Sequence, residues 1–105
     1  MLKVMMEFRK GILFVRLYGK LDSTTIDTFK KEVKEVIIDS GIRYVVLNTY
    51  NLESVSSDGV KEIKNLRKIL KKMDGAFFLF GGEIKELKSL VNLENELKVF
   101  ERVVI

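Results

Sequence analysis

Hydrophobic and polar residues alternate at the start of the chain. Every second residue of the first segment is apolar: Leu2, Val4, Met6 and Phe8. This period of two is typical of a strand with one buried face. The turn signal Lys10-Gly11 follows, and residues 12–18 are rich in β-branched and aromatic side chains. We therefore expect the two segments to pair as an antiparallel hairpin whose second strand ends at Gly19.

Two later segments repeat apolar residues at helical spacing. The first follows a polar stretch, residues 22–25, which offers several N-cap side chains, and Gly41 is a natural residue to end it. Its apolar residues are Ile26, Phe29, Val33, Val36 and Ile37. The second closes at Asp74-Gly75, and its apolar residues are Val60, Ile63, Leu66, Ile69, Leu70 and Met73. Both patterns predict helices that bury one face.

Unbroken apolar runs at residues 44–47 and 76–80 predict strands covered on both faces. Residues 48–59 between them are polar and loop-like, with Leu52 and Val55 as the apolar points. After residue 82 the pattern predicts a weaker third helix and a last strand at residues 99–105. The expected order is β-β-α-β-α-β-α-β. Strands that alternate with helices predict an α/β fold with some parallel pairing, because parallel neighbours need a helical crossover.

Composition narrows the classes of function. The 105 residues are 47% hydrophobic and 32% charged, which fits one globular domain without room for a second. The chain has no Cys and no His, which excludes thiol nucleophiles, His-based acid–base catalysis and the usual zinc sites. Charges interrupt the N-terminus, and no apolar run approaches the roughly 20 residues that span a bilayer. We expect a soluble cytoplasmic protein.

The net charge of +4 comes almost entirely from residues 59–75. The helix expected there carries six basic residues away from its apolar stripe: Lys61, Lys64, Arg67, Lys68, Lys71 and Lys72. Like charges four positions apart, such as Lys64 and Lys68, disfavour a helix by a few tenths of a kcal/mol. A solvated lysine face is the ordinary interpretation, and the functional one is an acidic protein partner. Nucleic acid is less favoured, because no aromatic residues are interleaved with the basic ones and no binding motif is present.

Two further features could carry chemistry. Asp22 and Asp58 each lie where a strand gives way to a helix, so parallel strands would bring them to one edge, where paired carboxylates could bind Mg²⁺ or accept phosphate. We prefer to interpret both as helix N-caps. Gly81-Gly82 follows a buried strand and could hold an anion, although a plain turn is the simpler interpretation. The motifs GxxxxGK[ST] and GxGxxG are absent.

Three motifs together resemble one family. Gly19-Lys20-Leu21-Asp22 looks like the GxLD element of the STAS domain, the family of bacterial anti-sigma factor antagonists. Residues 51–60, NLESVSSDGV, are similar to the family's segment D-L-S-x-[IVM]-D-S-[ST]-G-[LV]. Residues 82–100 resemble the family's closing helix and its L-x-x-x-[FL] tail. The resemblance covers nearly the whole chain, and the order and spacing of the motifs support it.

The resemblance implies a single STAS-like domain over residues 1–105, with a mixed central sheet of about five strands and helices packed against it. It implies a regulator without catalysis or cofactor, whose partner is an anti-sigma factor that is also a serine kinase. In that family the kinase phosphorylates a Ser or Thr on the loop before the second helix. The surface expected to meet the partner consists of Asp22, Ser54, Ser56, Ser57, Asp58, Gly59, Lys61 and Lys64.

The sequence departs from the family pattern at the acceptor position. The residue directly before Gly59 is Asp58, which cannot accept phosphate as an alcohol does, while the preceding Ser is kept as Ser57 and the family's Asp is Ser56. One hypothesis is that Ser57 or Ser56 is phosphorylated, and we favour Ser57. The other is that Asp58 is a fixed negative charge. A STAS domain that binds a nucleotide or another anion near Gly81-Gly82, or another signalling protein, is the alternative function.

Overall fold

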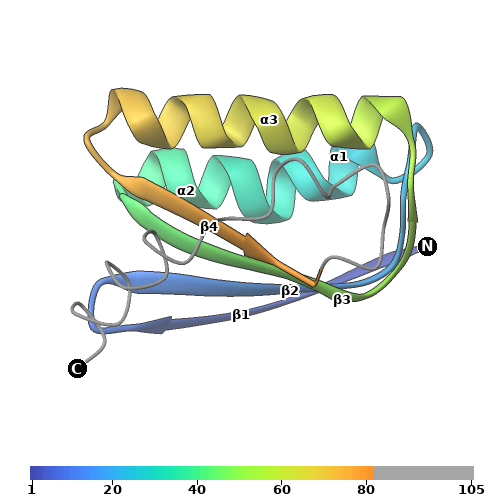
Figure 1. The fold of residues 1–105 in the computed structure, drawn as a ribbon, viewed down its shortest axis with the longest axis horizontal. Helices are drawn as coiled ribbons and strands as arrows, with labels where there is room; N and C mark the ends of the chain where they lie inside the picture. The colour runs from blue at the N-terminus through green and yellow to red at the C-terminus, as the bar shows by residue number, and fades with distance from the viewer. Residues whose placement is uncertain (82–105) are drawn as a thin grey trace.

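A four-stranded sheet with helices on one face makes up residues 1–81, the part of the chain that this computed structural model describes (Figure 1). The strands lie side by side in chain order: β1 (Leu2–Arg9), β2 (Ile12–Leu21), β3 (Tyr44–Val55) and β4 (Ala76–Phe80). β1 is antiparallel to β2, whereas β2, β3 and β4 run parallel. The predicted hairpin and the mixed α/β sheet are confirmed.

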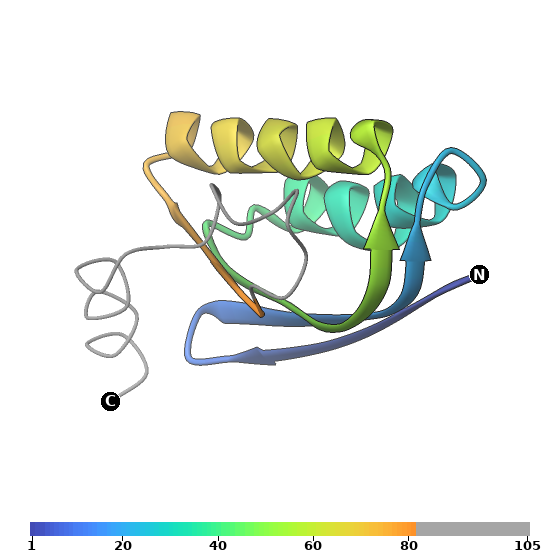
Figure 2. The same cartoon turned by 45° about the vertical axis from the view of Figure 1, so that its right-hand side comes forward.

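The helical layer has two parts on the same side of the sheet (Figures 1 and 2). The first runs without a break through α1 (Ile26–Phe29), the π-helical η1 (Lys30–Lys34) and α2 (Glu35–Ser40). The second is α3 (Ser57–Lys72). Both predicted stripes are confirmed, because each part buries its apolar face: Phe29, Val33 and Ile37 in the first, and Ile63, Leu66 and Leu70 in α3.

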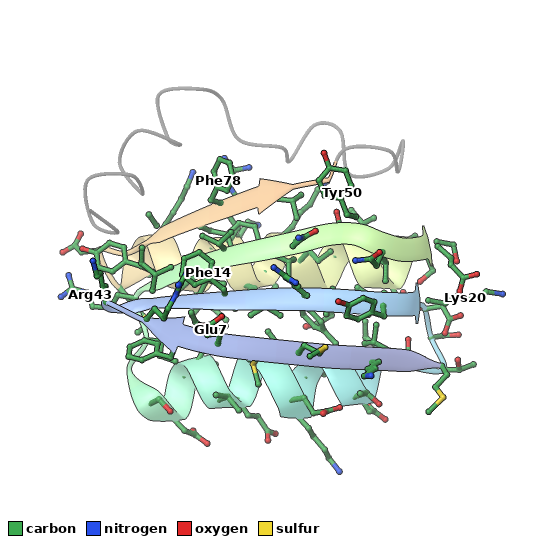
Figure 3. The ribbon with its side chains drawn as sticks, turned by 90° about the horizontal axis from the view of Figure 1, so that it is seen from below. Glu7, Phe14, Lys20, Arg43, Tyr50 and Phe78 are labelled. Atoms are coloured by element: carbon green, nitrogen blue, oxygen red, sulfur yellow. The ribbon has the colours of Figure 1, made fainter. Side chains whose placement is uncertain are left out.

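The main core lies between the sheet and these helices. Alternate strand residues such as Leu13, Val15 and Leu47 face it and are almost fully buried. A smaller cluster of Ile12, Val46 and Phe78 lies apart from it. Period-two alternation places this cluster on the other face of the sheet, the face seen in Figure 3. The central strands therefore bury residues on both faces, as the unbroken apolar runs predicted.

The central strands are longer than predicted. β2 continues through Gly19 to Leu21, and β3 takes in residues 48–55, which were expected to be a loop. The pairing of β2 with β3 shifts register twice, so that β3 holds two extra residues opposite β2. Such bulges break the period-two pattern of a strand. The interpretation of residues 48–59 as a loop was therefore wrong, because residues 48–55 belong to β3 and α3 begins at Ser57.

The prediction for the second half of β1 was also wrong. Leu2 and Val4 pack on the core, but Met6 and Phe8, on the same face, are 41% and 58% exposed. Alternation predicts which side of the sheet a residue faces and not whether another element covers it there. Along β1 the main core includes Leu2 and Val4 but neither Met6 nor Phe8.

The third helix and the last strand predicted from the sequence fall within residues 82–105, outside the described part. The fifth strand and the last two elements of the expected order therefore stay predictions. No helix among residues 1–81 is long and apolar enough to cross a membrane.

Candidate partner-binding site at the start of helix α3

The parallel strands β2 and β3 carry two of the three motifs to one edge of the sheet. Leu21 is the register partner of Val55, and Lys20 is that of Ser54. The pairing extends one step further, because the backbone N–H of Ser56 donates to the Leu21 carbonyl at 2.9 Å. Asp22 and Ser56 follow directly after the two strands. The prediction that parallel strands bring Asp22 and Asp58 to one edge of the sheet is therefore confirmed, since Asp22 follows β2 and Asp58 lies in the first turn of α3 after β3.

Ser56 is the N-cap of α3. Its backbone is extended (ψ 171°), and its Oγ accepts a hydrogen bond from the Gly59 N–H at 3.3 Å. This bond satisfies one of the free N–H groups of the first helical turn. The prediction that Asp58 is the cap was wrong: Asp58 lies inside the first turn, where its charge still stabilises the positive end of the helix dipole.

Asp22 stabilises a turn and not a helix terminus. Its Oδ1 accepts hydrogen bonds from the Thr24 hydroxyl at 2.6 Å and from the Thr24 N–H at 2.9 Å. The helix begins later, at Ile26, and its N-cap position is Thr25. The prediction that Asp22 caps the helix was therefore wrong. The Thr24 hydroxyl, followed by the Thr24 N–H, lowers the pKa of Asp22 below its ordinary value of 3.8.

Gly59 lets the start of α3 approach β2 closely. A Cβ on Gly59 would lie 2.9 Å from the Leu21 carbonyl oxygen and 3.0 Å from Cγ1 of Val55. Carbon atoms of side chains do not approach other heavy atoms this closely without displacement. The glycine of the motif is thus explained by packing.

Four accessible side chains form one stripe along α3. Ser57, Lys61, Lys64 and Lys68 follow one another at helical spacing, and all are exposed. Asp58 and Ser54 are also exposed next to the head of the stripe. Within residues 1–81, no ion pair involves Asp58, Lys61 or Lys64. The surface therefore combines the exposed Ser57 hydroxyl and Asp58 carboxylate with the positive charges of the lysines along the helix.

Glu62, the second acidic residue of α3, does not belong to this surface. Glu62, whose side chain is 15% exposed, pairs with Lys30 at 3.7 Å and with Lys34 at 3.6 Å. These two lysines lie on η1, so Glu62 joins the two parts of the helical layer. Sequence reasoning missed this cluster, because Lys30 and Lys34 are far from Glu62 along the chain and the pairing depends on tertiary packing.

The structure adds no ligating side chain to the other two candidate sites, the Asp22/Asp58 pair and Gly81-Gly82. The described residues contain no group of three or more side chains suited to hold a metal ion, so no third ligand joins Asp22 and Asp58. Gly81 (φ 105°) packs against β3: its carbonyl accepts from Thr49 Oγ1 at 3.1 Å, and a Cβ there would lie 2.6 Å from the Tyr50 nitrogen. Gly82 lies outside the described residues, so an anion site at Gly81-Gly82 stays a prediction.

Comparison with known proteins identifies the family. A family model described as the STAS domain matches residues 3–104. The chain belongs to the STAS domain family. A protein of Paenibacillus polymyxa named anti-sigma F factor antagonist is 32% identical to this STAS domain over 74 residues. The match takes in 70% of this chain and 63% of that protein, less than two thirds of the relative's length.

Solved structures share the fold of this STAS domain. The unphosphorylated anti-sigma factor antagonist SpoIIAA matches with a TM-score of 0.74 and 18% identity, over 96% of this chain and 97% of its own. The phosphorylated form of SpoIIAA from Bacillus matches with a TM-score of 0.71 and 16% identity, over 96% of this chain and 99% of its own. A putative anti-sigma factor antagonist from Thermotoga maritima matches with a TM-score of 0.76 and 18% identity, over 95% of this chain and 93% of its own.

Proposed function

We propose that this STAS domain is an anti-sigma factor antagonist, a regulator of transcription that acts by binding and not by catalysis. Its partner is an anti-sigma factor with serine kinase activity. Family membership and the name of the Paenibacillus relative support this proposal. The surface proposed to meet the partner is the one predicted from the sequence: the start of α3, with Asp22 and Ser54 beside it and Lys61 and Lys64 along the helix.

The exposure of Ser57 in the first turn of α3 carries the proposal of a phosphorylation switch. A kinase needs a serine hydroxyl that it can reach. Ser56 is less suited, because its oxygen caps the helix and its side chain is partly buried. A phosphate on Ser57 would lie near the N–H groups of the helix N-terminus and one turn from Lys61, which favours the added negative charge.

Asp58 supports the alternative, a domain that does not switch. Its carboxylate is exposed beside Ser57 and has no ion pair in the described part of the chain. A permanent charge at the family's acceptor position imitates part of a phosphoserine. In this alternative the domain holds one binding state and serves a partner that tolerates the charge.

The deciding experiment incubates the protein with ATP and the anti-sigma factor that co-purifies with it or is encoded beside it, and locates phosphate by mass spectrometry. Ser57→Ala and Ser56→Ala are the matched variants. We expect phosphate on Ser57, lost in Ser57→Ala and kept in Ser56→Ala. Absence of phosphate together with stable binding would favour the fixed charge of Asp58. Absence of both would contradict the anti-sigma factor proposal.

A binding titration tests the surface itself. Charge reversal at Lys64, Lys64→Glu, removes one exposed positive charge from the stripe and adds a negative one about two helical turns after Ser57. We expect the affinity for the anti-sigma factor to fall, mainly through slower association at low salt. Lys31→Glu is the matched control, because Lys31 is an exposed lysine on η1 outside the proposed surface. Equal effects of the two variants would contradict the assignment of Lys64 to the interface.

A further inference from the structure

No strand among residues 1–81 pairs with the outer edge of β1. β1 is the terminal strand of the sheet, and within residues 1–81 it pairs only with β2 (Figure 3). Its eight residues leave a row of backbone N–H and C=O groups on the other side. A free edge of this length is a template for pairing with another strand.

Exposed apolar side chains gather on this strand. Six large hydrophobic residues are exposed in the described part of the chain, and four of them lie between positions 1 and 8: Met1, Met5, Met6 and Phe8. Met6 and Phe8 face the helix side of the sheet and Met5 faces the other side. Because exposed apolar residues lie on both faces of this edge strand, the side chains of an added strand would pack beside apolar residues on both faces of the sheet.

The sequence of β1 is complementary to itself when it runs antiparallel about Met5. In that register Met5 meets Met5 of a second copy, Lys3 meets Glu7, Val4 meets Met6 and Leu2 meets Phe8. Each charge is opposite a charge of the other sign, and each apolar residue is opposite an apolar one. A slip by one residue would set Lys3 against Phe8 or Met6.

We propose that β1 is a homodimer interface, and that its partner is β1 of a second copy of this chain, antiparallel and centred on Met5. The two sheets then form one continuous sheet across a two-fold axis. Glu7 is available for Lys3 of the other copy, because its bridge to Arg9 at 3.4 Å joins two side chains that are more than 60% exposed and is correspondingly weak. The proposal uses no residue of the surface at the start of α3, so its failure leaves the proposed function standing.

A charge-reversal cycle on the full chain tests the register, with the dimer dissociation constant measured by analytical ultracentrifugation. Lys3→Glu and Glu7→Lys each set like charges opposite one another at two symmetry-related places. We expect each to weaken the dimer about tenfold. The double variant Lys3→Glu/Glu7→Lys restores the pairing and is expected to dimerise like the wild type. Lys68→Glu, the same charge change on α3, is the control and leaves the dimer unchanged.

A cysteine scan gives an independent readout, because the natural chain has no Cys. Residues directly opposite in an antiparallel pair have Cα atoms about 4.5 to 5.5 Å apart, within the range of a disulfide. Met5→Cys is therefore expected to form a disulfide-linked dimer on mild oxidation. Phe8→Cys, which would lie opposite Leu2 and far from the second copy's position 8, is expected to form little disulfide-linked dimer under the same conditions.

Three results would overturn the proposal. The first is a wild-type protein that is monomeric up to its solubility limit and a Met5→Cys variant that does not cross-link. The second is a dimer that Lys3→Glu and Glu7→Lys leave intact, which would place the contact elsewhere. The third is more efficient cross-linking of Phe8→Cys than of Met5→Cys, which would exclude the register centred on Met5. Far-UV circular dichroism of each variant verifies that it is folded.

Discussion

Gly59 packs against Leu21 where the chain passes from β3 into α3. A Cβ added to Gly59 would lie 2.9 Å from both the carbonyl oxygen and Cγ of Leu21. The Leu21 carbonyl also accepts the Ser56 N–H at 2.9 Å. The end of β2 therefore fixes the position of the first turn of α3, and with it the accessible side chains of Ser57 and Asp58.

Gly59→Ala is expected to destabilise the fold. An alanine within a helix ordinarily stabilises it by about 0.5 to 1 kcal/mol relative to glycine. Here the added methyl group meets Leu21 and Val55, and overpacking of this kind costs about 1 to 3 kcal/mol. Urea denaturation measures the free energy of unfolding. Asn65→Ala, at an exposed position on the same helix, is the control and is expected to be neutral or slightly stabilising. A stabilised Gly59→Ala variant would contradict the close packing.

Ser56→Ala is expected to lower the free energy of unfolding by about 1 kcal/mol, because it removes the side-chain oxygen that caps α3. Ser56→Asp keeps an acceptor at the cap and should lose much less. Ser57→Ala is the matched comparison: its side chain is exposed, so the change should stay within about 0.5 kcal/mol. The assignment of the cap to Ser56 would be wrong if Ser57→Ala were the more destabilising of the two alanine variants.

Thr24→Val is expected to raise the pKa of Asp22 toward 3.8, because it removes the hydroxyl that contributes most to lowering it. The Thr24 N–H remains, so the pKa should stay somewhat below 3.8. Carboxyl NMR during a pH titration measures the shift. Ser23→Ala, at the exposed neighbouring position, should leave the titration unchanged, and an equal shift in both variants would show that the hydroxyl is not the cause.

The hydrogen bonds between Thr24 and Asp22 also predict a dependence of stability on pH. Since the pKa of Asp22 is lower in the folded state than in the unfolded one, ionised Asp22 stabilises the fold above its unfolded pKa. This contribution is lost as the pH falls through the folded pKa. The difference in unfolding free energy between wild type and Thr24→Val should therefore be present at neutral pH and shrink in acid. A difference that grows in acid would contradict the sign.

Glu62→Gln is expected to destabilise the contact between η1 and α3 by about 1 kcal/mol, because it removes the charge that pairs with Lys30 and Lys34. A double-mutant cycle with Lys34→Gln isolates the pair and should give a coupling energy of about 0.5 kcal/mol. A coupling energy of zero would show that the two charges contribute independently. Glu32→Gln, an exposed acidic residue on η1, is the control.

Local patterns predicted the elements of the fold that depend on one face being buried. The stripes through Phe29 and Ile63 gave both helices, because each buried position recurs at the helical period. Strand ends were less predictable. The two bulges in β3 shift its alternation, so that Leu47, Leu52 and Val55 no longer follow a period of two. The bulges are register shifts between β3 and β2, and the apolar pattern of residues 48–55 did not predict them.

In the candidate site, too, some features follow from local sequence patterns and others depend on how the elements pack. The prediction that Asp22 and Asp58 lie at one edge of the sheet was correct, because each follows the end of a strand and the two strands are parallel. It did not distinguish Ser56 from Asp58 as the cap, because both residue types cap helices and the choice depends on where the strand ends. The Glu62 contacts and the exposure of Phe8 depend on which elements pack together, and a single sequence contains no direct signal for either.

The anchoring of α3 on the end of β2 has a consequence for recognition. The Ser56 backbone bond, the Ser56 cap and the Gly59 contact fix the first turn before any partner arrives. The conformational entropy of ordering this segment is therefore lost during folding and not during association. A protein that binds here meets a preorganised shape, so a single added charge changes the interaction without any rearrangement of the backbone.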